Sequence, residues 1–114
     1  MEIQVWVTCY SEKTDASISC GIYVESVSKN LDITDIKNIY EGLSESFWEN
    51  CQEFEDGVAQ ADTMQEDDPA LSFEQAILSI FGHFFISGTV DGEETELGID
   101  PIADDFMISL LKDI

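Results

Sequence analysis

Residues 36 to 68 contain the feature that most limits how this chain can fold: acidic residues at every fourth position of a stretch with helical apolar spacing. Glu41, Glu45, Glu49 and Glu53 would lie on consecutive turns of one helix. Apolar residues recur at intervals of three or four on the opposite side: Ile36, Tyr40, Leu43, Phe47, Cys51, Phe54 and Val58. The pattern predicts one long amphipathic helix over residues 33–55, with Gly57 as its C-terminal stop.

The spacing of these carboxylates indicates a purpose other than stability. Like charges four residues apart destabilise an isolated helix by about 0.2–0.5 kcal/mol per pair, and no lysine separates them. Successive carboxylates rise by about 6 Å along the axis, broadly similar to the spacing of phosphates on a nucleic-acid strand. We therefore expect this face to imitate a polyanion and to bind a basic protein. The predicted partner-binding residues are Glu41, Glu45, Trp48, Glu49, Gln52, Glu53, Glu55, Asp56, Asp62, Glu66, Asp67 and Asp68.

The overall charge supports a cationic partner. The net charge is −21, all four basic residues are lysines, and residues 38–111 contain eighteen acids without one lysine or arginine. Direct binding of nucleic acid or of an anionic membrane requires cationic contacts and is not expected. Adaptation to high salt is an alternative source of acidity. However, residues 1–30 contain four acids and residues 41–68 contain ten, a concentration that hydration does not require.

Length and composition predict a single packed domain over residues 1–114 in the cytoplasm. The hydrophobic fraction of 44% and twelve aromatic residues favour a packed core over a disordered acidic tail. The first residues do not resemble a secretory signal, and no apolar run approaches the ~18 residues of a membrane helix. Three cysteines without CxxC spacing are typical of free cytosolic thiols.

Two alternating segments predict an antiparallel hairpin. Residues 2–10 and 17–25 alternate between apolar and polar positions, and the polar residues 11–16 join them. The second face of this hairpin is aromatic, with Trp6, Tyr10 and Tyr23. Either a helix or a loop covers these rings, or they form a surface for a partner, where Trp and Tyr are enriched.

The middle of the chain reads as a loop followed by a helix and a strand. Residues 58–70 have little apolar content and are expected to be an acidic surface loop. Ser72 and Gln75 have the spacing of a capping box, which predicts a helix that ends at Gly82. Residues 83–90 follow as a strand buried on both faces, with Phe84, Phe85 and Ile86 in the core.

The C-terminal part predicts a second hairpin and a last helix. Asp91-Gly92 is a strong hairpin signal, and residues 94–99 would return as an acidic edge strand. Residues 101–112 form the last helix, with five residues facing inward: Ile102, Phe106, Met107, Leu110 and Ile114. The predicted fold class is therefore α+β: an antiparallel sheet of about four strands, with the long acidic helix and two shorter helices packed on it.

Catalytic and metal-binding patterns are missing from the sequence. The single histidine, His83, has no cysteine or carboxylate at ligand spacing, and the acidic segments lack the EF-hand pattern. No nucleophile elbow or phosphate-binding loop is present, so we expect a non-enzymatic protein without cofactor or metal. The core cysteines are expected to pack as small apolar residues.

These features favour a small acidic inhibitor that occludes the basic, nucleic-acid-binding surface of a partner. The preferred setting is an immunity protein that neutralises a nuclease toxin. An alternative is a DNA mimic of the kind with which phages counter restriction or CRISPR enzymes. Another alternative is an acidic chaperone or adaptor that holds its partner through the aromatic strand residues. Electrostatic complementarity fits the first two equally.

Overall fold

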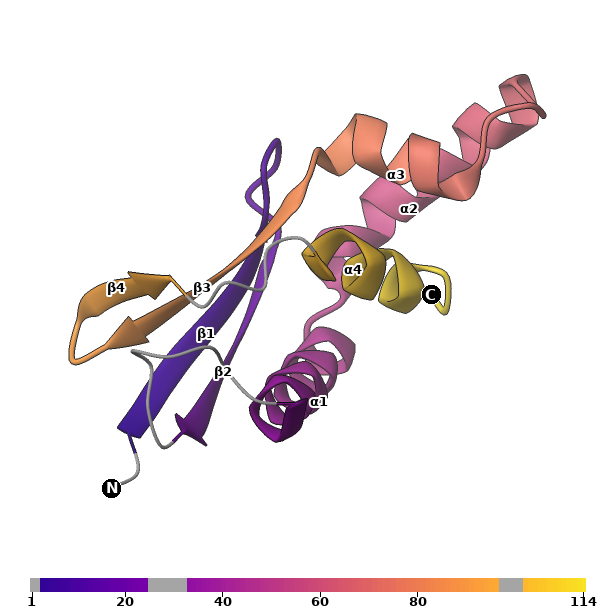
Figure 1. The fold of residues 1–114 in the computed structure, drawn as a ribbon. Coiled ribbons are helices and arrows are strands. Elements are labelled where there is room, and N and C mark those ends of the chain that lie inside the picture. Colours follow the sequence, from indigo (N-terminus) through magenta and orange to yellow (C-terminus); the bar gives the residue numbers. More distant parts are fainter. Residues whose placement is uncertain (1–2, 25–32, 97–101) are drawn as a thin grey trace.

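The computed structural model describes residues 3–24, 33–96 and 102–114, and the strands in these ranges form one antiparallel sheet (Figure 1). The strands are β1 (Ile3–Ser11), β2 (Ser17–Val24), β3 (Phe84–Val90) and β4 (Glu93–Glu96). Their order in the sheet is β2-β1-β3-β4, so β2 and β4 are the edges. The predicted α+β fold with a four-stranded antiparallel sheet is confirmed.

The β1–β2 hairpin follows the alternation that predicted it. Val5, Val7 and Cys9 of β1 are buried, and Ile18 and Ile22 of β2 are buried on the same face. The strands pair from Ile3–Val24 to Tyr10–Ser17. One face of the hairpin therefore contributes to the core, while the polar and aromatic positions lie on the other.

The helices in the described ranges lie on one side of the sheet or beyond one of its ends (Figure 1). They are α1 (Ile33–Glu49), α2 (Gln52–Asp67), α3 (Phe73–Phe81) and α4 (Ala103–Leu111). α1 packs on β2 and β1, and α4 packs on β3. α2 and α3 pack on each other beyond one end of the sheet, which gives the molecule its elongated shape of 53 × 24 × 22 Å.

The predicted single long helix is wrong, because α1 and α2 are separate helices. The backbone N–H of Asn50 bonds to the carbonyls of Ser46 and Phe47, and a new helix starts after Cys51. The aromatic core explains the break. In one straight helix, residues 47 and 54 would be about 10 Å apart along the axis. The break instead allows the Phe47 and Phe54 rings to stack with centroids 5.3 Å apart.

The predicted loop at residues 58–70 is also wrong, since α2 continues to Asp67. Phe54, Val58 and Ala61 form a buried stripe at helical spacing, and that stripe faces α3. Gly57 is not a helix stop but a contact point inside α2. A Cβ atom at this position would overlap the ring of Phe81, so glycine permits α2 and α3 to approach each other.

The signals at the ends of α3 and in the β3–β4 turn are confirmed. Ser72 and Gln75 form a complete capping box, and α3 ends at Gly82, whose φ is +71°. Asp91 and Gly92 have φ values of 52° and 84°, as a type I′ hairpin turn requires. No helix in the described part of the chain is long and apolar enough to cross a membrane.

Three residues predicted to lie in the core do not. Phe85 is half-buried, because alternation along β3 places it on the opposite face from Phe84 and Ile86. Ile102 and Ile114 are exposed, because they lie before the first and after the last residue of α4. Residues 97–101, where the returning strand was predicted to end and the last helix to begin, lie outside the described residues.

Candidate partner-binding surfaces

The structure exposes every residue that the sequence assigned to partner binding, but it distributes them over two helices. We call this set the helical acidic surface: Glu41, Glu45, Trp48, Glu49, Gln52, Glu53, Glu55, Asp56, Asp62, Glu66, Asp67 and Asp68. The break at Asn50 separates the part on α1 from the part on α2. The sequence predicted four carboxylates on consecutive turns of one helix, and the structure keeps three of them on one helix.

The three remaining carboxylates lie on α1. Glu41, Glu45 and Glu49 are exposed on consecutive turns. Lys37 Nζ lies 3.9 Å from Glu41 Oε1, and because both side chains are mostly exposed, this pair contributes little stability, although it places one positive charge at the start of the series. Trp48 is exposed beside them, and its ring contacts Phe47 at 4.9 Å between centroids. The rigid core thus supports one side of an indole that is otherwise open to solvent.

Glu53 lies where α2 meets the β1–β2 hairpin rather than among the carboxylates of α1. Its Oε2 atom accepts a hydrogen bond of 3.1 Å from the backbone N–H of Ser17, the first residue of β2. The hairpin tip is fixed in turn on α3, because the buried Ser11 Oγ donates to the Phe81 carbonyl at 2.6 Å. Glu53 therefore has a structural contact in addition to its charge.

A cleft of about 580 Å³ opens between the hairpin tip, α2 and α3. Asp15, Glu53 and Asp56 contribute carboxylates to its walls, and Gly57 and Phe81 also line it. Asp15 was not among the predicted residues. Its place beside α2 depends on the pairing of distant segments, and no local pattern in the sequence contains that information.

The C-terminal half of α2 adds acids at the far end of the molecule (Figure 1). Asp62, Glu66 and Asp67 are exposed along the last turns of α2, where no basic residue lies. Asp68 follows the helix, and its Oδ1 accepts a hydrogen bond of 3.1 Å from the backbone N–H of Ala70. Asp68 therefore also shapes the turn toward α3.

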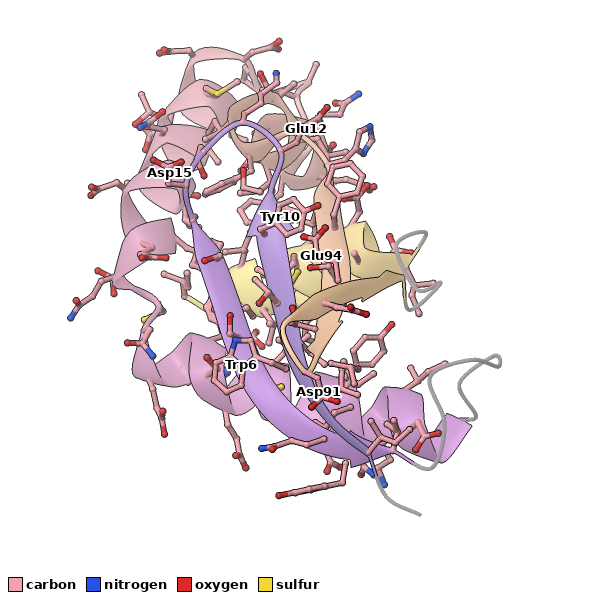
Figure 2. The ribbon with its side chains drawn as sticks, turned by 90° about the vertical axis from the view of Figure 1, so that its left-hand side faces the viewer. Trp6, Tyr10, Glu12, Asp15, Asp91 and Glu94 are labelled. Atoms are coloured by element: carbon pink, nitrogen blue, oxygen red, sulfur yellow. The ribbon has the colours of Figure 1, made fainter. Side chains whose placement is uncertain are left out.

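The other side of the sheet is not covered by any described element, and we call it the open sheet face (Figure 2). Trp6 is 54% exposed, Tyr10 40% and Tyr23 61%, so of the two alternatives that the sequence left open, no helix or loop of the described part of the chain covers these rings. The Tyr10 ring lies against Phe85, with centroids 5.7 Å apart. Exposed aromatic residues on a rigid sheet are typical of binding surfaces.

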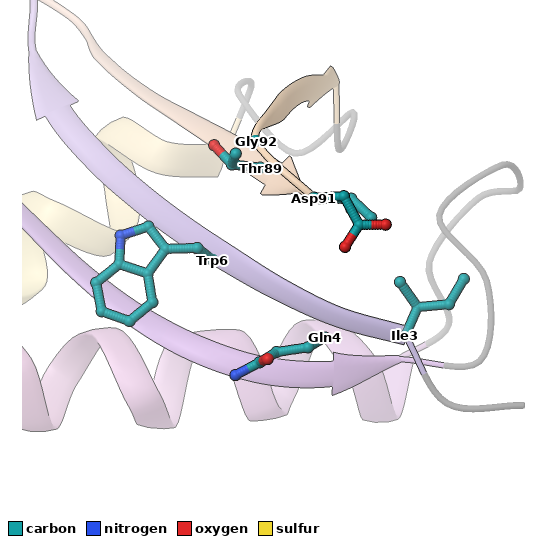
Figure 3. Close-up of a pocket in the computed structure, with 7 residues that line it drawn as sticks. Ile3, Gln4, Trp6, Thr89, Asp91 and Gly92 are labelled. Atoms are coloured by element: carbon teal, nitrogen blue, oxygen red, sulfur yellow. The ribbon is translucent and has the colours of Figure 1, made fainter.

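Carboxylates surround this aromatic face. Glu12 and Asp15 lie in the hairpin at one end of the sheet, and Asp91 and Glu94 lie at the β3–β4 hairpin (Figure 2). A hollow of about 530 Å³ lies between Trp6 and the β3–β4 turn, with Asp91 in its wall (Figure 3). The open sheet face thus combines aromatic rings with negative charge, as the helical acidic surface does at Trp48.

His83 connects α4 to the sheet. Its Nδ1 lies 2.7 Å from Asp104 Oδ2, and the other oxygen of Asp104 accepts from the backbone N–H of Phe84 at 2.7 Å. Glu12 Oε2 accepts from the backbone N–H of His83. The hydrogen bond and the charge of Asp104 raise the pKa of His83, desolvation opposes this, and the charge of Glu12 adds to it.

None of the three cysteines forms a disulfide; Cys9 is buried, and Cys20 and Cys51 are half-buried. Burial, assisted by the charge of Glu45, raises the pKa of Cys20. Desolvation and the neighbouring Glu55 raise the pKa of Cys51, whose Sγ donates to Glu55 Oε1 at 3.5 Å. Raised pKa values keep these thiols protonated and poorly reactive. Within the described ranges, no group of three or more His, Cys, Asp and Glu side chains is placed to hold a metal ion.

Comparisons of the chain with protein-family models, with curated protein sequences and with solved structures found no match. The two surfaces themselves must therefore indicate the function.

Proposed function

We propose that this protein is a small acidic inhibitor that binds a basic protein and occludes its nucleic-acid-binding surface. The helical acidic surface is the contact region, and the partner is a nuclease or another enzyme that acts on DNA or RNA. Binding requires no reaction at this chain, so the proposed activity is occlusion rather than catalysis. The partner's lysines and arginines would meet carboxylates in place of phosphates.

One observation supports this proposal most strongly: acids occupy the C-terminal turns of α1 and α2. Glu49 ends α1, and Glu66 and Asp67 end α2, with no basic residue in the last turn of either helix. The helix dipole favours cations there, so each acid costs about 0.3–1 kcal/mol at an exposed site. Stability alone would not retain these residues, whereas a cationic partner would reverse the sign of their contribution on binding.

The preferred biological setting is an immunity protein that neutralises a nuclease toxin. Occlusion of a basic catalytic cleft needs a rigid acidic surface, and the buried ring row of Phe47, Phe54, Phe81 and Phe84 supports α1, α2 and α3 from below. A DNA mimic that counters a restriction or CRISPR enzyme would use the same surface. The partner's genetic neighbourhood separates the two, since a toxin gene is expected beside its immunity gene.

The test is affinity capture from the native lysate at low salt, followed by elution with increasing salt. The eluted protein should be basic and should bind or cleave nucleic acid, and the purified chain should suppress that activity at a one-to-one ratio. A captured protein without affinity for nucleic acid would contradict the proposal. So would a nuclease whose activity is unaffected by a saturating amount of this chain.

The exposed rings of Trp6, Tyr10 and Tyr23 favour a second candidate function, that of an acidic adaptor which holds its partner through the open sheet face. Replacement of Glu41, Glu45 and Glu49 by Gln discriminates between the two. An inhibitor of the proposed kind should lose most of its affinity in this variant, whereas an adaptor should retain it. Truncation of Trp6 and Tyr23 to Ala should abolish the binding of an adaptor, whereas an inhibitor should keep the part of its affinity that depends on the carboxylates of α1.

A further inference from the structure

The two edges of the sheet differ in how they are protected against pairing with another strand. β4 contains Glu93, Glu94 and Glu96 in four residues, a charge density that discourages pairing. β2 is twice as long, and from Ser17 to Val24 it contains no charged residue and no proline. The outer edge of β2 therefore lacks the charges that protect the edge at β4.

The ladder geometry shows which backbone groups β2 presents outward. Ser11 N–H donates to the Ala16 carbonyl at 3.0 Å, and bonded and non-bonded pairs alternate from there along the hairpin. The residues whose N–H and C=O groups point to the outer edge are therefore Ser17, Ser19, Gly21 and Tyr23. Glu53 accepts from Ser17. Among the described residues, no hydrogen bond engages the outward groups of the other three.

An aromatic platform lies directly beside this edge. The Trp6 ring extends from β1 across β2, where Gly21 provides the space: a Cβ atom at Gly21 would lie 3.4 Å from the ring (Figure 3). Tyr23 lies next along β2 and is the most exposed of the large apolar side chains. Both rings are on the open sheet face, so a strand added to β2 would place alternate side chains next to them.

We propose that the outer edge of β2 accepts an extended cationic segment of the partner, which pairs as a fifth strand. The backbone of that segment would bond to Ser19, Gly21 and Tyr23. Its arginine or lysine side chains would lie over Trp6 and Tyr23, with Glu53 and Asp15 at the hairpin end of the strand. A second copy of this chain fits poorly, because two molecules of charge −21 would be brought together.

This inference rests on the proposed function only for the sign of the partner's charge. The helical acidic surface would provide long-range attraction, and the β2 edge would provide backbone recognition. The two contributions are therefore separable by experiment, because backbone pairing depends on N–H groups and the attraction depends on carboxylates.

The test uses a capped decapeptide of alternating arginine and threonine as the probe, titrated into the full chain. Hydrogen exchange followed by NMR should show protection of the amides of Ser19, Gly21 and Tyr23 on addition of the peptide. The matched control peptide alternates arginine with proline, which keeps the charge but cannot pair as a strand. It should bind at least about tenfold more weakly, a loss of about 1.4 kcal/mol.

Three variants locate the contact. Ser19→Pro removes one outward N–H and should weaken the arginine–threonine peptide by about tenfold. Ser19→Ala removes only the side-chain bond to Thr8, and Glu94→Pro removes an outward N–H from the opposite edge strand, so both should bind within about twofold of the original. Urea unfolding of each variant verifies the fold.

Several results would overturn the inference. One is equal binding of the two peptides, and another is failure of the arginine–threonine peptide to bind. Amide protection on β4 or the helices instead of β2 would also contradict it, as would a dimer joined through β2 in analytical ultracentrifugation. The exchange measurement on the unmodified chain decides the outcome even if Ser19→Pro does not fold. Loss of peptide pairing with retained capture of a basic nuclease would leave the proposed function standing.

Discussion

Gly57 illustrates how one missing Cβ atom determines the contact between α2 and α3. Replacement of Gly57 by Ala should lower the free energy of unfolding by about 1–3 kcal/mol, because the added methyl overlaps the buried Phe81 ring. This effect should exceed the ~1 kcal/mol by which alanine is preferred inside a helix. Urea unfolding measures the change. In a double-mutant cycle, Phe81→Leu provides the second substitution. The double variant should lose less free energy of unfolding than the sum of the losses of the two single variants. Strictly additive losses would contradict the overlap.

His83 makes stability depend on pH in a predictable direction. Its pKa is raised in the folded protein by Asp104, so its contribution to stability is fully present below its unfolded pKa. That contribution is lost as pH rises through the higher folded value. The urea concentration at the unfolding midpoint should therefore decrease as the pH rises from about 6 to about 8. The decrease should be larger in the original protein than in Asp104→Asn. NMR titration of this single histidine should give a lower pKa in the variant; an unchanged pKa would contradict the pairing.

The contacts of His83 also mark the limit of sequence reasoning at this scale. The sequence places this lone histidine in no motif and gives it no partner. Its partner Asp104 lies 21 positions later, where its place in the first turn of a helix already explained its charge. Pairings of this kind arise from the packing of α4 on β3, and no local periodicity contains them.

At the scale of elements, the strands, α3 and the second hairpin were predictable because short patterns specify them. The two errors were both in the acidic stretch. The break after Glu49 has neither Gly nor Pro, and it is accompanied by the stacking of Phe47 on Phe54, a contact that no local pattern contains. The extension of α2 does have a signal in the spacing of Phe54, Val58 and Ala61, but Gly57 in the middle of that spacing predicts a stop. A glycine that serves close packing and one that ends a helix look alike in a sequence.

The carboxylates of α1 should show a conflict between stability and binding. Glu45→Lys turns two repulsive i, i+4 relations, with Glu41 and Glu49, into attractive ones. The variant should be more stable to urea by about 0.4–1 kcal/mol per pair, because the lost repulsion and the gained attraction each contribute about 0.2–0.5 kcal/mol. Its affinity for the captured basic partner should fall by at least about tenfold. A variant that gained stability without losing affinity would remove α1 from the binding surface.

Asp113→Lys is the matched control for this substitution. It changes the net charge by the same amount, but Asp113 lies on the exposed C-terminus after α4 and has no acid four residues away. It should leave the affinity closer to that of the original protein than Glu45→Lys does, and any gain in stability would come from the dipole of α4 rather than from charge pairs on α1.

At the scale of the whole molecule, composition predicts the charge of the partner. The arrangement of sheet and helices identifies the surfaces on which that partner could bind. The sequence left open whether Trp6, Tyr10 and Tyr23 are covered. The answer depends on which side of the sheet the helices occupy, because both sides of β1 and β2 contain large side chains. The helices lie on the aliphatic side, and the aromatic side is exposed. The molecule therefore presents acidic and aromatic groups on the open sheet face (Figure 2) and also on the helical acidic surface, where Trp48 is exposed.

The most direct measurement of the central proposal is the association rate with the captured basic partner as a function of salt. Charges on this surface act over a Debye length of about 8 Å at physiological ionic strength and about 3 Å at 1 M. Stopped-flow association should therefore slow by at least about tenfold between 50 mM and 500 mM NaCl, and the slope should flatten when Glu41, Glu45 and Glu49 are replaced by Gln. An association rate that does not change with salt would contradict an inhibitor that works by imitating a polyanion.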